Sequence, residues 1–118
     1  MSVDRFVAHQ RRVAEAAQER RRTTSAAIRA RLPAVLDELT KLGATRVILF
    51  GSVARGEAEE DSDLDLAVEG LPAARLFDAM AKALRAAGRP VDLLRLEEAP
   101  TTLRDRVLAD GEVVRDAG

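Results

Sequence analysis

The alternation of apolar and polar residues predicts short strands and amphipathic helices. Apolar residues recur at helical spacing in four segments: 2–22, the segment from Pro33 to Gly43, 73–87 and 101–109. Short apolar and β-branched runs, typical of strands, lie at 46–50, 64–69, 91–96 and 112–115. This order predicts an α/β (α+β) fold, in which a small mixed β-sheet of about four strands carries packed helices.

The inward faces of the helices are predicted from the same spacing. The expected core residues of the last two helices are Leu76, Phe77, Met80 and Leu84, followed by Leu103, Val107 and Leu108. Near the N-terminus, Thr23–Thr24–Ser25 either interrupts the helix, with Ser25 as the N-cap of the next one, or is crossed by a continuous helix. Pro33 predicts a helix start or a kink.

The residues after the first strand are suited to binding an anion. Gly51 ends the apolar run where a larger side chain would block the close approach of a phosphate. Ser52 adds a hydroxyl and a backbone N–H at the same point. If residues 53–55 turn helically, their N–H groups face outward together and favour an anion.

Two carboxylates open the second strand. Asp63 and Asp65 are two residues apart, so on a strand they project from one face. Hard oxygen ligands of this kind suit Mg²⁺, which binds a few carboxylates together with water and substrate phosphate. With the preceding turn they describe a nucleoside triphosphate site. The alternative is an ordinary hairpin with an acidic, solvated loop.

A third acidic residue, Asp92, lies one residue into an apolar strand, where an unpaired charge would be costly. If this strand lies beside the one that carries Asp65, the carboxylates meet. Alternatively, Asp92 caps a strand end or pairs with Arg89 or Arg95.

These residues resemble the signature of the DNA polymerase beta nucleotidyltransferase superfamily, and most closely its minimal nucleotidyltransferase (MNT) branch. The resemblance covers roughly residues 33 to 116 and is carried by Gly51–Ser52, Arg55–Gly56 and Ser62–Leu66. It implies that Asp63, Asp65 and Asp92 form a catalytic and metal-binding triad that holds two Mg²⁺ ions. It further implies that Gly51 and Ser52 hold the phosphates of ATP. Arg55 either touches phosphate or pairs with Glu57 or Glu59.

The resemblance also implies a partner. MNT proteins act with a HEPN-domain protein, commonly a ribonuclease toxin, and the implied reaction transfers AMP from ATP to a tyrosine of that toxin. The chain would then be an antitoxin in a hetero-oligomer. Two other functions stay open: transfer to a small molecule or an RNA end, and neutralisation of a toxin by binding alone.

Charge and composition add expectations about domain organisation, nucleic-acid binding and localisation. Residues 1–31 carry a net charge of +5 and the remainder -6, so we divide the chain into a basic helical extension (1–32) and a nucleotidyltransferase domain (33–118). The extension is expected to pack on a partner or a second copy, with packing on its own domain as the alternative. Direct nucleic-acid binding is not expected from 3 Phe without Tyr or Trp, although the basic arm keeps it open. Without cysteine, an apolar span or a leader pattern, we expect a cytoplasmic protein.

Overall fold

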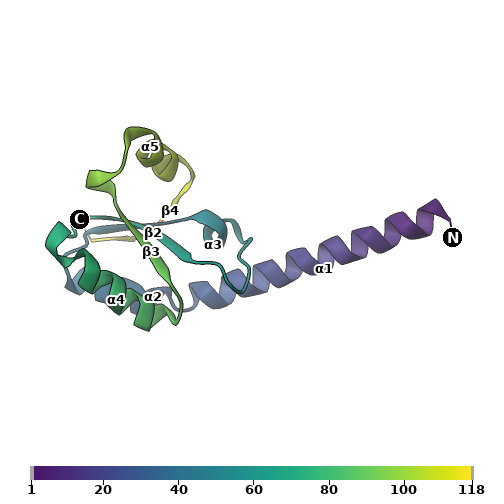
Figure 1. Cartoon of the computed structure of the whole chain (residues 1–118), viewed down its shortest axis with the longest axis horizontal. Coiled ribbons are helices and arrows are strands. Elements are labelled where there is room, and N and C mark those ends of the chain that lie inside the picture. Colours follow the sequence, from purple (N-terminus) through teal and green to yellow (C-terminus); the bar gives the residue numbers. More distant parts are fainter. Residues whose placement is uncertain (1, 118) are drawn as a thin grey trace.

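A four-stranded mixed sheet, ordered β3–β2–β1–β4, forms the centre of the computed structural model, which describes residues 2–117. The strands are β1 (Arg46–Phe50), β2 (Leu64–Glu69), β3 (Val91–Arg95) and β4 (Glu112–Asp116). β1 runs antiparallel to both β2 and β4, whereas β2 and β3 are parallel (Figure 1). The predicted mixed sheet with packed helices is confirmed.

The helices follow the predicted order, with one addition. They are α1 (Val3–Arg29), α2 (Leu32–Lys41), α3 (Gly51–Arg55), α4 (Leu76–Ala87) and α5 (Thr101–Asp110), with short 3₁₀ turns η1 (Ala73–Arg75) and η2 (Leu96–Glu98). α1 is continuous through Ser25, so that residue is not an N-cap. The helix ends at Arg29 with Ala30 as its C-cap, and Pro33 lies in the first turn of α2, where its missing N–H has no consequence.

One face of the sheet is fully covered. The inward residues of β1 and β2 form a single core with α2, α4 and the end of α1, and its members include Val47, Leu49, Leu64, Leu66, Val68, Val35, Leu39 and Ile28. Leu64, Leu66 and Val68 are each 0% exposed. Their alternation along β2 is the one that the sequence predicts.

The inward face of α4 agrees with the prediction in part. Half-buried Leu76 and Met80 pack against the core as predicted. Phe77 is 83% exposed and Leu84 is 47% exposed, whereas Ala79 and Ala83 are fully buried. The small alanines allow α4 to lie close to α2 and β3, which it contacts.

The opposite face of the sheet is covered only in part. There Ile48 and Ala67 pack with Leu96 and Val107, and half-buried Phe50, Leu94 and Leu103 surround them. Of the predicted inward residues of α5, Leu108 is instead 42% exposed. Val107 and Leu108 are about 100° apart around the helix axis, so they do not share a single inward direction.

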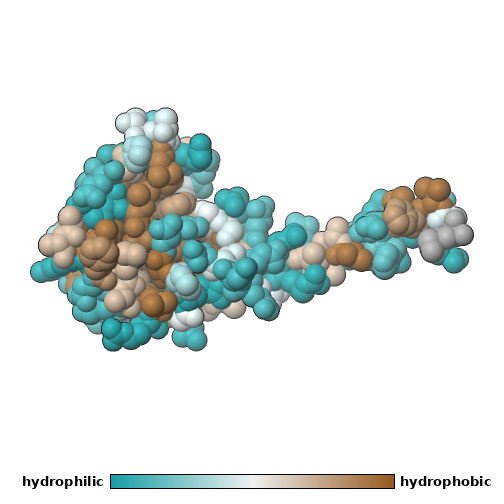
Figure 2. All heavy atoms as spheres, viewed as in Figure 1, coloured by the Kyte–Doolittle hydropathy of each residue, from teal (hydrophilic) through white to brown (hydrophobic). Residues whose placement is uncertain are grey.

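α1 extends well beyond this body, and the molecule measures 62 × 30 × 21 Å (Figure 1). Its first turns expose Val3, Phe6, Val7 and Val13, and apolar groups interrupt the hydrophilic surface of this projection in Figure 2. Its last turns bury Ser25 and Ile28. The division of the chain after residue 32 stays a prediction. Among residues 2–117, no helix has the length and apolar character that a membrane crossing requires.

Candidate active site

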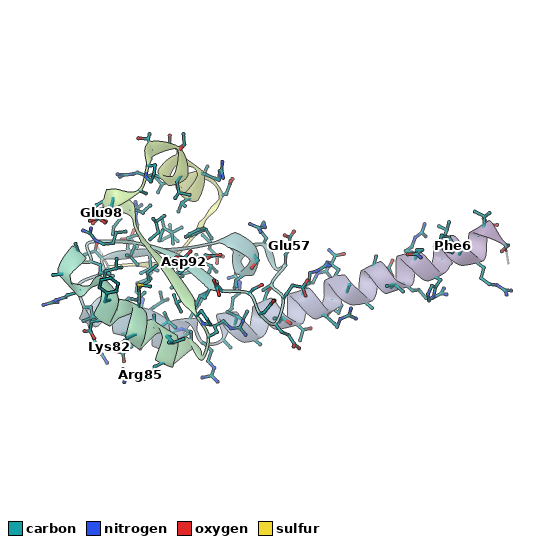
Figure 3. The ribbon with its side chains drawn as sticks, viewed as in Figure 1. Phe6, Glu57, Lys82, Arg85, Asp92 and Glu98 are labelled. Carbon is teal, nitrogen blue, oxygen red and sulfur yellow. The ribbon has the colours of Figure 1, made fainter. Side chains whose placement is uncertain are left out.

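The pairing of β2 with β3 brings two of the predicted aspartates together. Asp65 lies directly opposite Asp92 in the parallel register, and Asp63 precedes β2 by one residue. Paired residues of neighbouring strands project from the same face. The next residues in that alternation, Ala67 and Leu94, belong to the cluster beneath α5. The carboxylates of Asp65 and Asp92 therefore lie on the α5 face of the sheet. Figure 3 labels Asp92 on β3.

The surroundings of Asp65 disfavour its charged form. Burial raises the pKa of Asp65, and the neighbouring carboxylates of Asp92 and Asp63 raise it further, while Arg55 opposes these effects. The four side chains consequently share one electrostatic neighbourhood. Ionisation of Asp65 is therefore less favourable than for a carboxyl group in water, and a bound cation would relieve the repulsion.

Gly51 lies against the side chain of Asp65. Its φ is +76°, a left-handed conformation, and a Cβ added to it would lie 2.1 Å from Oδ2 of Asp65. Any larger residue would therefore meet both backbone strain and the carboxylate. Because Phe50 pairs with Asp65 across β1 and β2, the turn after Phe50 is held at the carboxylate by the sheet itself.

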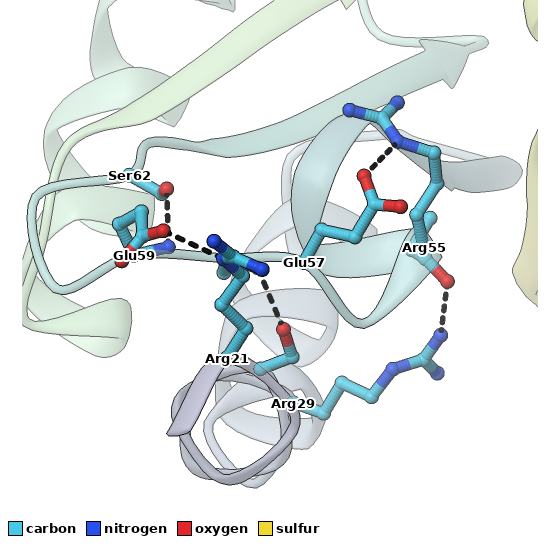
Figure 4. Close-up of polar contacts among 9 residues, drawn as sticks. Arg21, Arg29, Arg55, Glu57, Glu59 and Ser62 are labelled. Carbon is cyan, nitrogen blue, oxygen red and sulfur yellow. Dashed lines mark hydrogen bonds and ion pairs between the residues drawn. The ribbon is translucent and has the colours of Figure 1, made fainter. Parts of the chain in front are cut away.

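The residues after Gly51 form a short helix, which meets the condition stated from the sequence for N–H groups that face outward together. α3 starts at Gly51 and includes Ser52, whose carbonyl accepts a hydrogen bond from the Glu57 N–H at 2.9 Å. The first N–H groups of any helix lack partners within it, so those of this turn remain available to a ligand. Arg55 donates from Nε to Oε2 of Glu57 at 3.0 Å (Figure 4). One alternative for Arg55 thus occurs in the structure, and a phosphate contact stays a prediction.

Arg89 organises the loop before Asp63. Arg89 Nη1 donates to the carbonyl of Ser62 at 2.8 Å and to that of Glu60 at 3.2 Å. The Leu64 N–H also bonds to the Pro90 carbonyl at 3.0 Å. The loop that ends in Asp63 is therefore tied to the start of the strand that carries Asp92. From the sequence, Arg89 was only a candidate partner for Asp92, because nothing local showed that its guanidinium would reach carbonyl groups of another loop.

The other arginine beside Asp92 is also engaged elsewhere. Arg95 donates to the carbonyl of Leu71 at 2.8 Å and pairs with Glu98. The acidic loop residue Glu59 is exposed and forms an ion pair with Arg21 of α1 at 2.8 Å. The alternative in which Asp92 pairs with Arg89 or Arg95 is thus not what the described residues show.

The donor set fits Mg²⁺. Within residues 2–117, no three Asp, Glu or His side chains are gathered into a ready-made cation site. Mg²⁺ does not require one, because it is usually bound by one or two carboxylates, with water and substrate phosphates completing the octahedron. Asp65 and Asp92 at paired positions, with Asp63 nearby, supply oxygen ligands of that kind.

The family of the chain is evident from comparison with known proteins. Residues 37–117 match the family model described as polymerase beta, nucleotidyltransferase. A relative from Methanocaldococcus jannaschii, named "Putative protein adenylyltransferase MJ0435", is 34% identical over 77 residues, which cover 63% of this chain and 83% of the relative.

Two solved structures share the fold. "Structure of putative minimal nucleotidyltransferase" aligns with a TM-score of 0.67 and 37% identity, over 75% of this chain and 93% of its own. "Crystal structure of the toxin-antitoxin with AMP-PNP" aligns with a TM-score of 0.65 and 26% identity, over 71% of this chain and 72% of its own. Since the family match includes every strand of the sheet and all three aspartates, the chain belongs to the polymerase beta nucleotidyltransferase family and is a nucleotidyltransferase.

Proposed function

We propose that this chain transfers AMP from ATP to a protein hydroxyl in an Mg²⁺-dependent reaction, and that it acts as an antitoxin by modifying a tyrosine of a HEPN-domain toxin. The observation that carries the proposal is the pairing of Asp65 with Asp92 directly above the Gly51 turn. The relative named as a protein adenylyltransferase and the toxin–antitoxin structure with AMP-PNP support the same reaction.

Each site residue has a role in this proposal. The N–H groups at Gly51 and Ser52 hold the β- and γ-phosphates, and Arg55 leaves Glu57 to contact phosphate. Asp63 and Asp65 hold metal and triphosphate, while Asp92 serves the acceptor side as metal ligand or base. Two Mg²⁺ ions, when bound, would offset phosphate charge and increase the acidity of the acceptor hydroxyl.

The transfer is an in-line displacement at the α-phosphorus of ATP. The tyrosine oxygen forms a bond to that phosphorus, the bond from phosphorus to the bridging oxygen breaks, and pyrophosphate leaves. The phenolic proton passes to the carboxylate of Asp92, which is exposed on β3 and open to an incoming side chain. Asp65 is half-buried behind it and keeps its position through the strand pairing.

A bound partner would supply the acceptor in the correct orientation. Docking of a protein fixes its hydroxyl in line with the α-phosphate, and such positioning accounts for roughly 7–11 kcal/mol of barrier reduction in the best cases. The body of the chain after residue 31 has a net charge of -6, which suits a basic, RNA-binding partner. AMP added in the active site of such a toxin would block it.

The test is intact-mass spectrometry of the co-encoded HEPN partner after incubation with this chain, ATP and Mg²⁺. We expect a gain in steps of one AMP, which disappears in a variant with Asn at positions 63, 65 and 92. No gain in mass, together with full toxin inhibition by the triple variant, would support a binding-only antitoxin. AMP found instead on RNA or on a small molecule would identify a different acceptor.

A further inference from the structure

α1 carries three polar side chains that contact the segment between the Gly51 turn and the aspartates. They are Arg21, Ser25 and Arg29, spaced four residues apart and therefore on one side of the helix. We call them the α1 clamp. Arg21 bonds to Glu59, Ser25 to the backbone of Ala58 and Arg29 to the backbone of Ala54. Figure 4 labels Arg21, Arg29 and Glu59 in this region.

Ser25 makes the central contact. The Ala58 N–H donates to Oγ of Ser25 at 2.9 Å, and the two residues are 2% and 0% exposed. The hydroxyl therefore satisfies a backbone donor that water does not reach. An alanine at position 25 would keep the helix but leave this N–H without its acceptor.

Arg29 joins three elements. Its Nη2 donates to the carbonyl of Ala54 in α3 at 3.3 Å, and its Nη1 pairs with Glu112 of β4 at 2.7 Å. The last carbonyls of a helix have no partner within it, so this guanidinium both caps α3 and fixes it to the sheet. Arg21 adds the ion pair with Glu59 at 2.8 Å farther along the loop.

The segment held in this way has little structure of its own. α3 spans only Gly51–Arg55, and a helix of this length is not stable without outside contacts. The loop after it is anchored at its far end by Arg89. The clamp anchors its near end, and the Gly51 turn and Asp63 lie at the two ends of the segment.

We propose that Arg21, Ser25 and Arg29 are positioning residues, which hold the Gly51 turn and the Asp63 loop in the geometry that binds the triphosphate. This inference rests on the proposed nucleotidyl transfer and adds residues from outside the family match, which begins at residue 37. A consequence is that α1 is a functional part of the nucleotide site as well as a projection from the domain.

The first test is amide hydrogen exchange of Ser25→Ala in the full chain. We expect the Ala58 N–H to exchange at least tenfold faster and the rest of residues 51–62 to lose protection, with α4 unchanged. Thr23→Ala, an exposed hydroxyl change on the same helix, is the matched control. Unchanged exchange at Ala58 would overturn the inference. Because this measurement needs no acceptor, it decides the clamp even if the proposed transfer reaction is wrong.

The second test measures nucleotide affinity in Arg29→Ala. Arg29 is half-buried, so this variant is available if Ser25→Ala folds poorly. We expect Mg²⁺–AMP-PNP to bind at least fivefold more weakly to Arg29→Ala, with partial rescue in Arg29→Lys. Arg22→Ala is the control, since Arg22 pairs with Glu19 inside α1. In transfer assays well below the melting temperature, KM for ATP should rise more than kcat falls. Wild-type affinity in folded Arg29→Ala would overturn the inference, whereas absence of AMP-PNP binding to the wild-type chain would count against the proposed function alone.

Discussion

The two faces of the sheet differ in what covers them. On one face, Leu66 and Val68 of β2 are fully buried under α2 and α4. On the other face, α5 covers Ala67, while Asp65 remains half-buried at the end of the same strand. A single strand thus contributes alternate residues to the core and to the proposed site. Along β2, the side chains that point to one face stabilise the core, and those that point to the other face contribute to the proposed site.

The faces also differ in their electrostatic cost. The covered face contributes favourable apolar burial, whereas the open face sets Asp65 and Asp92 at paired positions, with the charge of Asp63 nearby. Burial raises the pKa of Asp65, and the neighbouring charges of Asp92 and Asp63 raise it further. Substitutions on the two faces should therefore have opposite signatures in stability and in activity.

The largest effect is expected for Asp65→Asn. The change keeps the size of the side chain but removes a charged metal ligand, and metal-ion stabilisation of a transition state is worth several kcal/mol, which corresponds to about 10²-fold or more in rate. Melting temperature without Mg²⁺ should stay the same or rise, because repulsion is relieved. Nucleotidyl transfer and thermal unfolding are the two measurements. Near-wild-type transfer would exclude the proposed role of Asp65, and Asp61→Asn in the exposed loop is the control.

Leu66→Ala should have the reverse signature. Leu66 is 0% exposed, and removing a buried leucine side chain costs roughly 2–5 kcal/mol of unfolding free energy. Nucleotide affinity of the folded fraction should change little, since the side chain points away from the site. Urea unfolding measures the loss, with Leu84→Ala, a 47% exposed leucine, as the control. An equal loss in both variants would argue against the observed burial.

Gly51→Ala should reduce both stability and nucleotide binding, because Gly51 directly follows β1 and lies against the carboxylate of Asp65. The positive φ and the contact with the Asp65 carboxylate should together destabilise the fold by about 1–3 kcal/mol. Binding of AMP-PNP should weaken at the same time, as the turn or the carboxylate must move. Calorimetric titration and urea unfolding would show both losses, and wild-type values in both would contradict the geometry of the turn.

A smaller effect is expected from pH. The pKa of Asp65 is raised above its ordinary value of 3.8 by burial and by the charges of Asp92 and Asp63, against Arg55. The folded state therefore binds this proton more tightly than the unfolded state. The resulting contribution to the free energy of unfolding is fully present below the pKa of Asp65 in the unfolded state, and it is lost as pH rises through the pKa in the folded state. Without divalent cations, the gain in stability of Asp65→Asn over wild type should grow as pH rises over this range. A difference that is constant with pH would show that Asp65 does not titrate as described.

The smallest effect on stability and on nucleotide affinity is expected from removing residues 1–17. The apolar side chains in this part of α1 that the structure describes are largely exposed, with Val3 at 77% and Phe6 at 54%, so neither face of the sheet depends on them. Melting temperature and AMP-PNP affinity should stay close to wild type, while binding of a partner or a second copy weakens. Loss of folding would show instead that the projection packs on its own domain.

The sequence by itself determined the strands, the alternation along β2 and the glycine at the turn. These features depend on local periodicity and on single-residue conformational limits, which act over a few neighbouring residues. The motifs at Gly51–Ser52, Arg55–Gly56 and Ser62–Leu66 carried the resemblance from which the family was predicted.

Only the tertiary structure decided which distant segments meet. Asp92 could have paired with a neighbouring arginine, and its place opposite Asp65 follows from the order and register of the strands. The alanine face of α4 and the buried role of Ser25 were likewise undetermined, since helical periodicity allows several inward directions and a serine suits a cap or a buried hydrogen bond. Packing selects among such alternatives, because close contact between elements depends on side chains that are far apart in the sequence.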